Sequence, residues 1–154
     1  MDSVFGLLDR KQTIKNAKQF LYEYRDWQLE AARFSFSLQS PMMDGMPKAQ
    51  SDPRHTRQED KMIKQATARM ECELRLKTIQ LMSSIDDQNA FLADLLEYRF
   101  INHYTVKKCC ERLAEKYDLG YLAERTYNDY QKQALWVFAI VCPRDTLRAK
   151  KVRR

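Results

Sequence analysis

Two helices and a turn between them are indicated by residues 105–141, TVKKCCERLAEKYDLGYLAERTYNDYQKQALWVFAIV. Thr105 is suited to cap a helix over residues 105–117, because its side-chain oxygen can accept a hydrogen bond from a free amide. Gly120 can adopt the positive φ of a turn, and a second helix is expected over residues 123–141. Two helices joined by a short glycine-containing turn have the layout of a helix-turn-helix.

The second of these helices has an apolar stripe that should face inward and a polar face that should point outward. The stripe comprises Tyr127, Tyr130, Ala134, Leu135 and Phe138. On the polar face, Arg125 could donate twice to guanine and Asn128 could pair with adenine in a major groove. Asp129 could accept from cytosine or orient Arg125, while Thr126 and Lys132 suit phosphate contacts at the flanks. A solvated helix face is the alternative interpretation.

The start of the preceding helix and the end of the chain add further candidates. Backbone amides and positive charge at a helix start commonly hold a phosphate, which favours Thr105, Lys107 and Lys108. The predicted DNA-binding residues are Thr105, Lys107, Lys108, Glu124, Arg125, Thr126, Asn128, Asp129, Lys132, Arg148, Lys150 and Lys151.

The composition predicts an all-α protein without a metal or cofactor. The chain has 154 residues, with only 3 Gly and 4 Pro, and is poor in the turn and β-branched residues that sheets need. Its 4 cysteines and 2 histidines lack the spacing of a zinc site, and no stretch is apolar enough to be a membrane span or a secretory signal. A reduced, cytoplasmic protein is the simplest expectation.

Positive charge is concentrated in the second half of the chain. The formal net charge is +6, and residues 1–60 and 61–99 are each neutral overall. The excess lies in residues 100–154, and most of it in residues 144–154, which are expected to be frayed and to follow the DNA backbone. A tail that only aids solubility is the alternative.

The first half of the chain predicts a helical hairpin. One helix is expected over residues 11–38, with seven apolar residues at spacings of 3 and 4: Ala17, Phe20, Tyr24, Trp27, Ala31, Phe34 and Leu38. The window 40–53 holds three prolines and Gly45, and cannot be regular helix. Its methionines, Met42, Met43 and Met46, either close the end of the hairpin or, less favoured, present a surface to a partner such as RNA polymerase.

The return helix of the hairpin is expected from about residue 57 to residue 85. One apolar face carries Ile63, Ala66, Met70, Leu74, Leu81 and Ile85, and a second apolar side is formed by Leu76, Ile79 and Met82. Such a helix needs two partners, the first helix and either a second subunit or the C-terminal half. Asp86 and Asp87 supply cap chemistry for a further helix over residues 89–101. The chain thus divides into a self-association arm, residues 1–85, and a DNA-binding domain with a basic tail, residues 86–154.

The chain resembles the ArpU family of phage transcriptional regulators. The resemblance rests on Glu124-Arg125-Thr126-Tyr127, on Gln133-Ala134-Leu135 with Phe138-Ala139, and on the loop from Ser40 to Lys48 followed by Glu59-Asp60. It covers about residues 15–150, although relatives commonly place Ser where this chain has Ala123. It implies a helix-turn-helix similar to the promoter-reading domain of sigma factors.

The resemblance implies an activator of late phage genes for packaging, structure and lysis, acting in the host cytoplasm on double-stranded DNA and through the host RNA polymerase. A homodimer is possible under this interpretation. Two alternatives are a small-terminase-like packaging subunit and a helical module that binds polymerase without reading DNA. An enzyme is not expected, because the two histidines are far apart and no phosphate-binding glycine loop occurs. A low-pKa thiol at Cys109 is a weaker hypothesis than its burial.

Overall fold

The computed structural model describes residues 4–39 and 53–152, and it is all-helical over them, as the composition predicts. The only extended pairing in these two ranges is one antiparallel bridge between Leu8 and Lys150. The helices are α1 (Arg10–Tyr22), α2 (Tyr24–Gln39), α3 (Pro53–Ser83), α4 (Asp87–Leu96), α5 (Val106–Lys116) and α6 (Glu124–Val141), with a π-helical turn at Glu97–Ile101 and a 3-10 turn at Asp145–Leu147. In this part of the chain no helix could cross a bilayer. The Met-containing loop of residues 41–52 lies outside the described residues.

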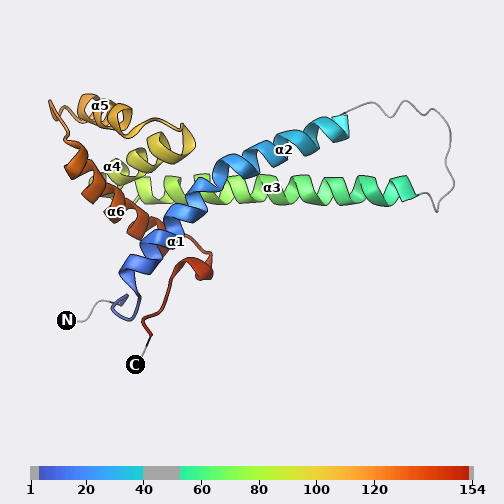
Figure 1. Ribbon diagram of the computed structural model, residues 1–154, viewed down its shortest axis with the longest axis horizontal. Coiled ribbons are helices and arrows are strands. Elements are labelled where there is room, and N and C mark those ends of the chain that lie inside the picture. The colour runs from blue at the N-terminus through green and yellow to red at the C-terminus, as the bar shows by residue number, and fades with distance from the viewer. Residues whose placement is uncertain (1–3, 40–52, 153–154) are drawn as a thin grey trace.

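The arrangement is a two-helix arm that projects from a helical body. Figure 1 shows α2 and the first half of α3 extending together away from α1, α4, α5 and α6. α6 is the central helix of the body, and α1, α3, α4 and α5 all pack against it. The predicted caps of the body helices are confirmed: Asp86 accepts from the amide of Asn89, and Thr105 from that of Lys108.

The helix expected over residues 11–38 is broken at Glu23, so the prediction of one continuous helix is wrong at this point. Arg75 of α3 donates to the carbonyl of Phe20, at 2.8 Å, in the last turn of α1. A side chain that enters the backbone ladder of a helix is a recognised cause of a bend. The bend lets α1 pack against α6, while α2 packs against α3.

Of the two apolar sides expected for α3, the chain buries the second, where Ile79 and Met82 are almost fully enclosed. Ile63, Met70, Leu81 and Ile85 are more than half exposed, while the face toward the rest of the chain carries Ala68, Glu71, Arg75, Thr78, Ile79 and Met82. The polar members of that buried face all have partners, which is what allows burial. The hydrophobic pattern therefore indicated the side that carries Ile79 and Met82, but not that Glu71, Arg75 and Thr78 are buried with them.

One core contains residues from both sides of the expected division at residue 85. Phe20 of α1 packs on Phe138 of α6, with ring centres 6.0 Å apart, and Met82 of α3 belongs to the same cluster. Asp9 and Ala149 are joined by a backbone hydrogen bond of 2.7 Å, so the two ends of the chain are also held together.

The C-terminal segment is held against the body rather than frayed as far as Lys151, whose amide donates to the carbonyl of Leu7, which corrects the prediction for residues 144–151. Leu147 is buried, and the amide of Ala149 donates to Thr13 of α1 at 3.0 Å. The segment is anchored because it covers the apolar junction of α1 and α6, and because its polar backbone groups find partners there.

The turn between α5 and α6 contains two residues with positive φ. Gly120, at φ +73°, behaves as predicted, but the residue that ends α5 is Asp118, at φ +52°. The amide of Leu119 donates to the carbonyl of Ala114, and that of Asp118 to Glu115, the pattern of a Schellman motif. Leu119, between Asp118 and Gly120, is 46% exposed.

Candidate nucleic-acid interface

The outward face of α6 is exposed as predicted. Its exposed polar residues are Glu124, Arg125, Thr126, Asn128, Asp129 and Lys132. The inward stripe is confirmed as well, because Tyr127, Ala134, Leu135 and Phe138 are buried and Tyr130 is partly buried. α6 therefore presents a row of side chains with hydrogen-bonding capacity on a rigid, well-packed helix.

A groove runs between this face and α1. Three lysines of α1 line it opposite Asn128 and Lys132 of α6; they are Lys11, Lys15 and Lys18. Their spacing of 4 and 3 residues places all three on one side of α1. α1 contains no acidic residue, so the groove has a strongly basic wall. Asp9, at its end, is the N-cap of α1 and accepts from the amide of Gln12.

The α1 lysines were not among the predicted site residues. Residues 1–60 are neutral as a block, and that average conceals the helix from Arg10 to Tyr22, which has four basic residues and no acid. A charge count over one helix length would have found the signal. What sequence could not show is that this helix lies against α6, 110 positions later in the chain.

Contacts between α1 and α6 hold the walls of the groove in place. The guanidinium of Arg10 lies 5.2 Å from the ring centre of Trp136, and the Phe20 and Phe138 rings pack together further along. Asn16 donates to the carbonyl of Leu147 at 3.3 Å, so the C-terminal segment braces α1 from the other side. The relative position of the lysines and the α6 face is therefore set by packing.

The candidates at the start of α5 lie in a separate, shallow groove. Thr105, Lys107 and Lys108 line it together with Glu111, Arg112 and Glu115 of the same helix. The Lys108 ammonium is also 4.0 Å from the centre of the Tyr104 ring, a cation–π distance. The oxygen of Thr105 is engaged as the cap of α5.

A second hollow, between α5 and the start of α6, has the opposite charge. Its lining residues are Lys107, Cys110, Glu111, Ala114, Glu115, Asp118, Gly120, Tyr121, Leu122 and Glu124. Four carboxylates against one lysine make this side of α6 unfavourable for a phosphate. The electrostatic potential therefore differs between the two sides of α6, and the positive side is the one toward α1.

The C-terminal candidates divide into two kinds. Arg148 donates to the carbonyls of Ala139 and Cys142, at 2.9 and 2.6 Å, and also pairs with Asp145. These are carbonyls at the C-terminal end of α6, so Arg148 caps that helix rather than reaching outward. Lys150 and Lys151 are exposed, and their backbone runs beside Leu7 and Leu8, just before α1.

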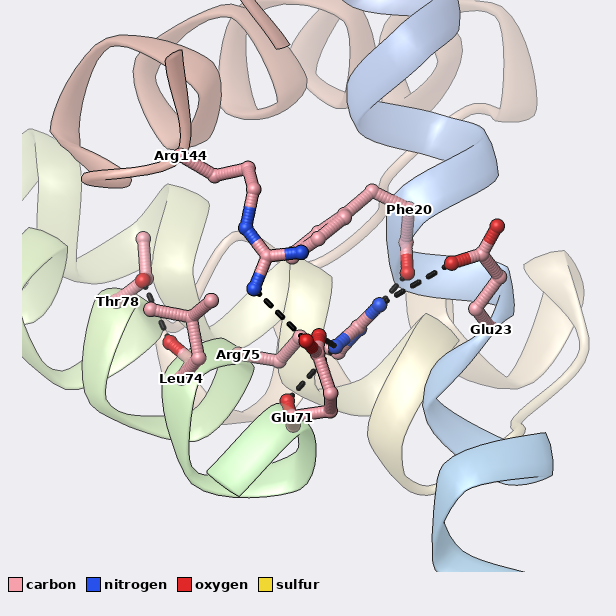
Figure 2. A network of polar contacts seen from close by, with 7 residues as sticks. All are labelled: Phe20, Glu23, Glu71, Leu74, Arg75, Thr78 and Arg144. Atoms are coloured by element: carbon pink, nitrogen blue, oxygen red, sulfur yellow. Dashed lines mark hydrogen bonds and ion pairs between the residues drawn. The ribbon is translucent and has the colours of Figure 1, made fainter. Parts of the chain in front are cut away.

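A buried ion network joins the arm to the body (Figure 2). Arg75 is fully buried and bonds Glu71 at 2.8 Å and Glu23 at 3.3 Å, while Arg144 reaches the other oxygen of Glu71 at 2.8 Å. Burial by itself raises the pKa of Glu71. Hydrogen bonds from Arg144 and Arg75 and their positive charges outweigh burial and hold the pKa below its ordinary value of 4.5. Arg144 is thus a structural cation and adds little to the basic surface.

The two adjacent thiols of α5 are not activated. Cys109 and Cys110 are buried in α5, and burial raises the pKa of each above its ordinary value. The hypothesis of a low-pKa thiol at Cys109 is therefore wrong. Among the residues that the structure describes, no group of His, Cys, Asp and Glu could hold a metal ion.

No family model, no curated protein and no solved structure matches this chain.

Proposed function

We propose that this chain binds duplex DNA through the outward face of α6, with the lysines of α1 on the adjoining phosphate backbone, and that it regulates transcription. The observation that carries the proposal is the groove in which Lys11, Lys15 and Lys18 of α1 face Asn128 and Lys132 of α6. Neither helix alone has both the base-reading side chains and the concentration of positive charge.

The outward face of α6 and the α1 side of the groove have different roles in the proposed recognition. Exposed Arg125 and Asn128 carry the donor and acceptor pairs that distinguish guanine and adenine in a major groove. The α1 lysines, in a groove where four lysines outnumber one carboxylate, supply the contacts that position a protein on DNA without reading sequence. The acidic hollow on the other side repels the backbone and so limits the ways in which a duplex can lie.

The resemblance to the ArpU family makes the regulator class more specific. The run Glu124-Arg125-Thr126 begins α6 and is exposed, which suits a recognition helix of the sigma type. On this basis the chain is an activator of late phage genes that works with the host RNA polymerase. The seven-residue link from Tyr117 to Ala123 is longer than the usual 3–4-residue turn of a helix-turn-helix, so the angle of α5 to DNA differs from that of shorter versions.

A salt series on a labelled random-sequence duplex tests the proposal. Four lysine–phosphate contacts predict a slope of log K against log salt of about −3.6 or steeper. Replacing Lys11, Lys15 and Lys18 together by Gln should make the slope shallower by about 2.7. Lys64→Gln, on the arm, is the matched control and should leave the slope unchanged.

Two results would overturn the proposal. One is the absence of measurable duplex affinity at low salt, which would favour a module that binds polymerase alone. The other is equal loss of affinity in the triple variant and in the Lys64→Gln control.

A further inference from the structure

The acidic hollow between α5 and the start of α6 has an apolar floor. Cys110 and Leu122, which form part of that floor, are 6 and 7% exposed, and Ala114 is partly buried beside them. The hollow has a volume of about 620 Å³, which lies within the range of pockets that bind ligands. The described part of the chain therefore leaves a depression with an apolar surface that a side chain of another molecule can enter.

Four carboxylates line the hollow together with this floor. They are exposed and belong to Glu111, Glu115, Asp118 and Glu124. None of the four forms an ion pair with another residue that the structure describes, and the lining contains one basic residue, Lys107. Glu111 and Glu115 are one helical turn apart on α5, where like charges destabilise a helix. A cation from another molecule would lower the repulsion among these carboxylates.

An exposed aromatic ring completes the lining. Tyr121 is 81% exposed, and within the described ranges its ring contacts neither a second ring nor a cation. The face of an aromatic ring attracts the cations of lysine and arginine. The ring and the carboxylates thus favour the same kind of ligand, and the floor adds a place for an apolar side chain.

We infer that the acidic hollow binds a short basic segment of a partner protein, in which an aliphatic side chain lies between lysines or arginines. The aliphatic side chain covers the apolar floor, and the flanking cations pair with the carboxylates and lie against Tyr121. Charge complementarity selects this occupant, because an acidic or uncharged segment would leave the carboxylates without partners. The inference goes beyond the proposed function and does not depend on it.

The position of the hollow allows the partner and DNA to be bound together. The lysines of the proposed DNA groove, Lys11, Lys15 and Lys18, belong to α1, whereas the hollow is lined by α5, the turn and the first residue of α6. The two sites share no residue. A bound basic segment would also neutralise carboxylates near the start of α6 and so would not repel a duplex on that helix.

Fluorescence polarisation of labelled peptides with the full chain tests the docking. The probe is the peptide RKLRK, which should bind with a dissociation constant on the order of 100 μM at low salt. The peptide RKSRK has the same charge and should bind about 10-fold more weakly, because it has no aliphatic side chain to cover the floor. Equal affinity for the two peptides would show attraction of cations without docking and would overturn the inference.

Removal of the carboxylates tests whether the hollow is the site. The combined variant Glu111→Gln, Glu115→Gln and Asp118→Asn should bind RKLRK about 10-fold more weakly, because three exposed ion pairs are lost. Asparagine suits position 118, since it tolerates the positive φ of +52° found there. Glu124 is left unchanged because a carboxylate in the first turn stabilises α6.

A matched control removes the same charge from other exposed positions. Asp26→Asn, Glu73→Gln and Glu97→Gln together should leave the affinity for RKLRK unchanged. Equal loss in the two triple variants would contradict the assignment to the hollow. Tyr121→Ala should weaken binding about 3-fold and Tyr121→Phe should retain it, because phenylalanine keeps the ring.

Two further outcomes would overturn the inference. One is no measurable binding of RKLRK at about 1 mM of the unmodified chain. The other is a dimer in sedimentation that becomes a monomer in the triple carboxylate variant of the hollow, which would assign the hollow to a second copy. The variant with Lys11, Lys15 and Lys18 replaced by Gln should bind RKLRK at least as tightly as the unmodified chain, so failure of peptide binding and failure of DNA binding are separable.

Discussion

Arg75 and Phe20, 55 positions apart, are joined twice. The Arg75 Nε donates to the carbonyl of Phe20 at 2.8 Å, and its guanidinium lies 3.7 Å from the centre of the Phe20 ring. A fully buried cation is thus held by a backbone carbonyl, an aromatic face and carboxylates together (Figure 2). This contact places the bend between α1 and α2, and the bend brings the α1 lysines to the side of α6.

Arg75→Met should destabilise the chain by about 3–5 kcal/mol, because the partners of the buried guanidinium lose their counter-charge while remaining enclosed. Urea denaturation followed by circular dichroism measures the change. The control is Arg33→Met, which removes the exposed pair with Glu30 and should cost at most about 1 kcal/mol. Similar losses of unfolding free energy in both variants would show that the interactions of Arg75 contribute no more than an exposed ion pair.

Stability should fall in acid through Glu71. Its pKa in the folded chain lies below the ordinary 4.5, because Arg144 and Arg75 outweigh the effect of burial. A lowered carboxyl pKa contributes stability that is present above the unfolded value and is lost as the pH falls through the folded value. The free energy of unfolding should therefore decrease below about pH 4.5, and Glu71→Gln should reduce this dependence. An unchanged pH profile in the variant would assign the acid sensitivity to other carboxylates.

Ala123→Ser should stabilise α6 by about 1 kcal/mol. Ala123 is the N-cap, with φ −72° and ψ 146°, and offers no side-chain hydrogen bond. A serine in this conformation can accept from a free amide of the first turn. Thr105→Ala removes the side-chain cap of α5 and is the control. This variant should lose about the same free energy of unfolding. Thermal denaturation of both variants compares the two, and no gain from the serine would mean that the first turn of α6 is already satisfied by other groups.

Arg125→Ala should cost about 1–3 kcal/mol on a sequence selected from random duplexes and should relax the preference at one base pair. Lys132→Ala, on the groove side of α6, should instead weaken binding by the same factor on all sequences. Competition binding with single-base variants of the selected duplex distinguishes the two. Equal loss for Arg125→Ala on selected and random DNA would limit that residue to phosphate contact.

Features that depend on residues close together in the chain could be predicted from the sequence. The all-α class, the inward stripe of α6, the caps at Asp86 and Thr105 and the positive φ of Gly120 follow from interactions within a few residues, and the structure bears them out. The exposed row of Arg125, Asn128 and Lys132 follows for the same reason, since a helix period of 3.6 sorts one side from the other.

Tertiary structure decided what depends on partners distant in the chain. The burial of Arg75 on α3 could not be predicted by hydrophobicity, because this side chain is buried only where Phe20, Glu71 and Glu23 are assembled around it. The basic groove could not be predicted either, since the lysines of α1 line it only because α1 lies against α6 in the folded chain. The sequence alone therefore determined which side chains each helix could offer, whereas the packing of helices far apart in the chain determined which of them meet.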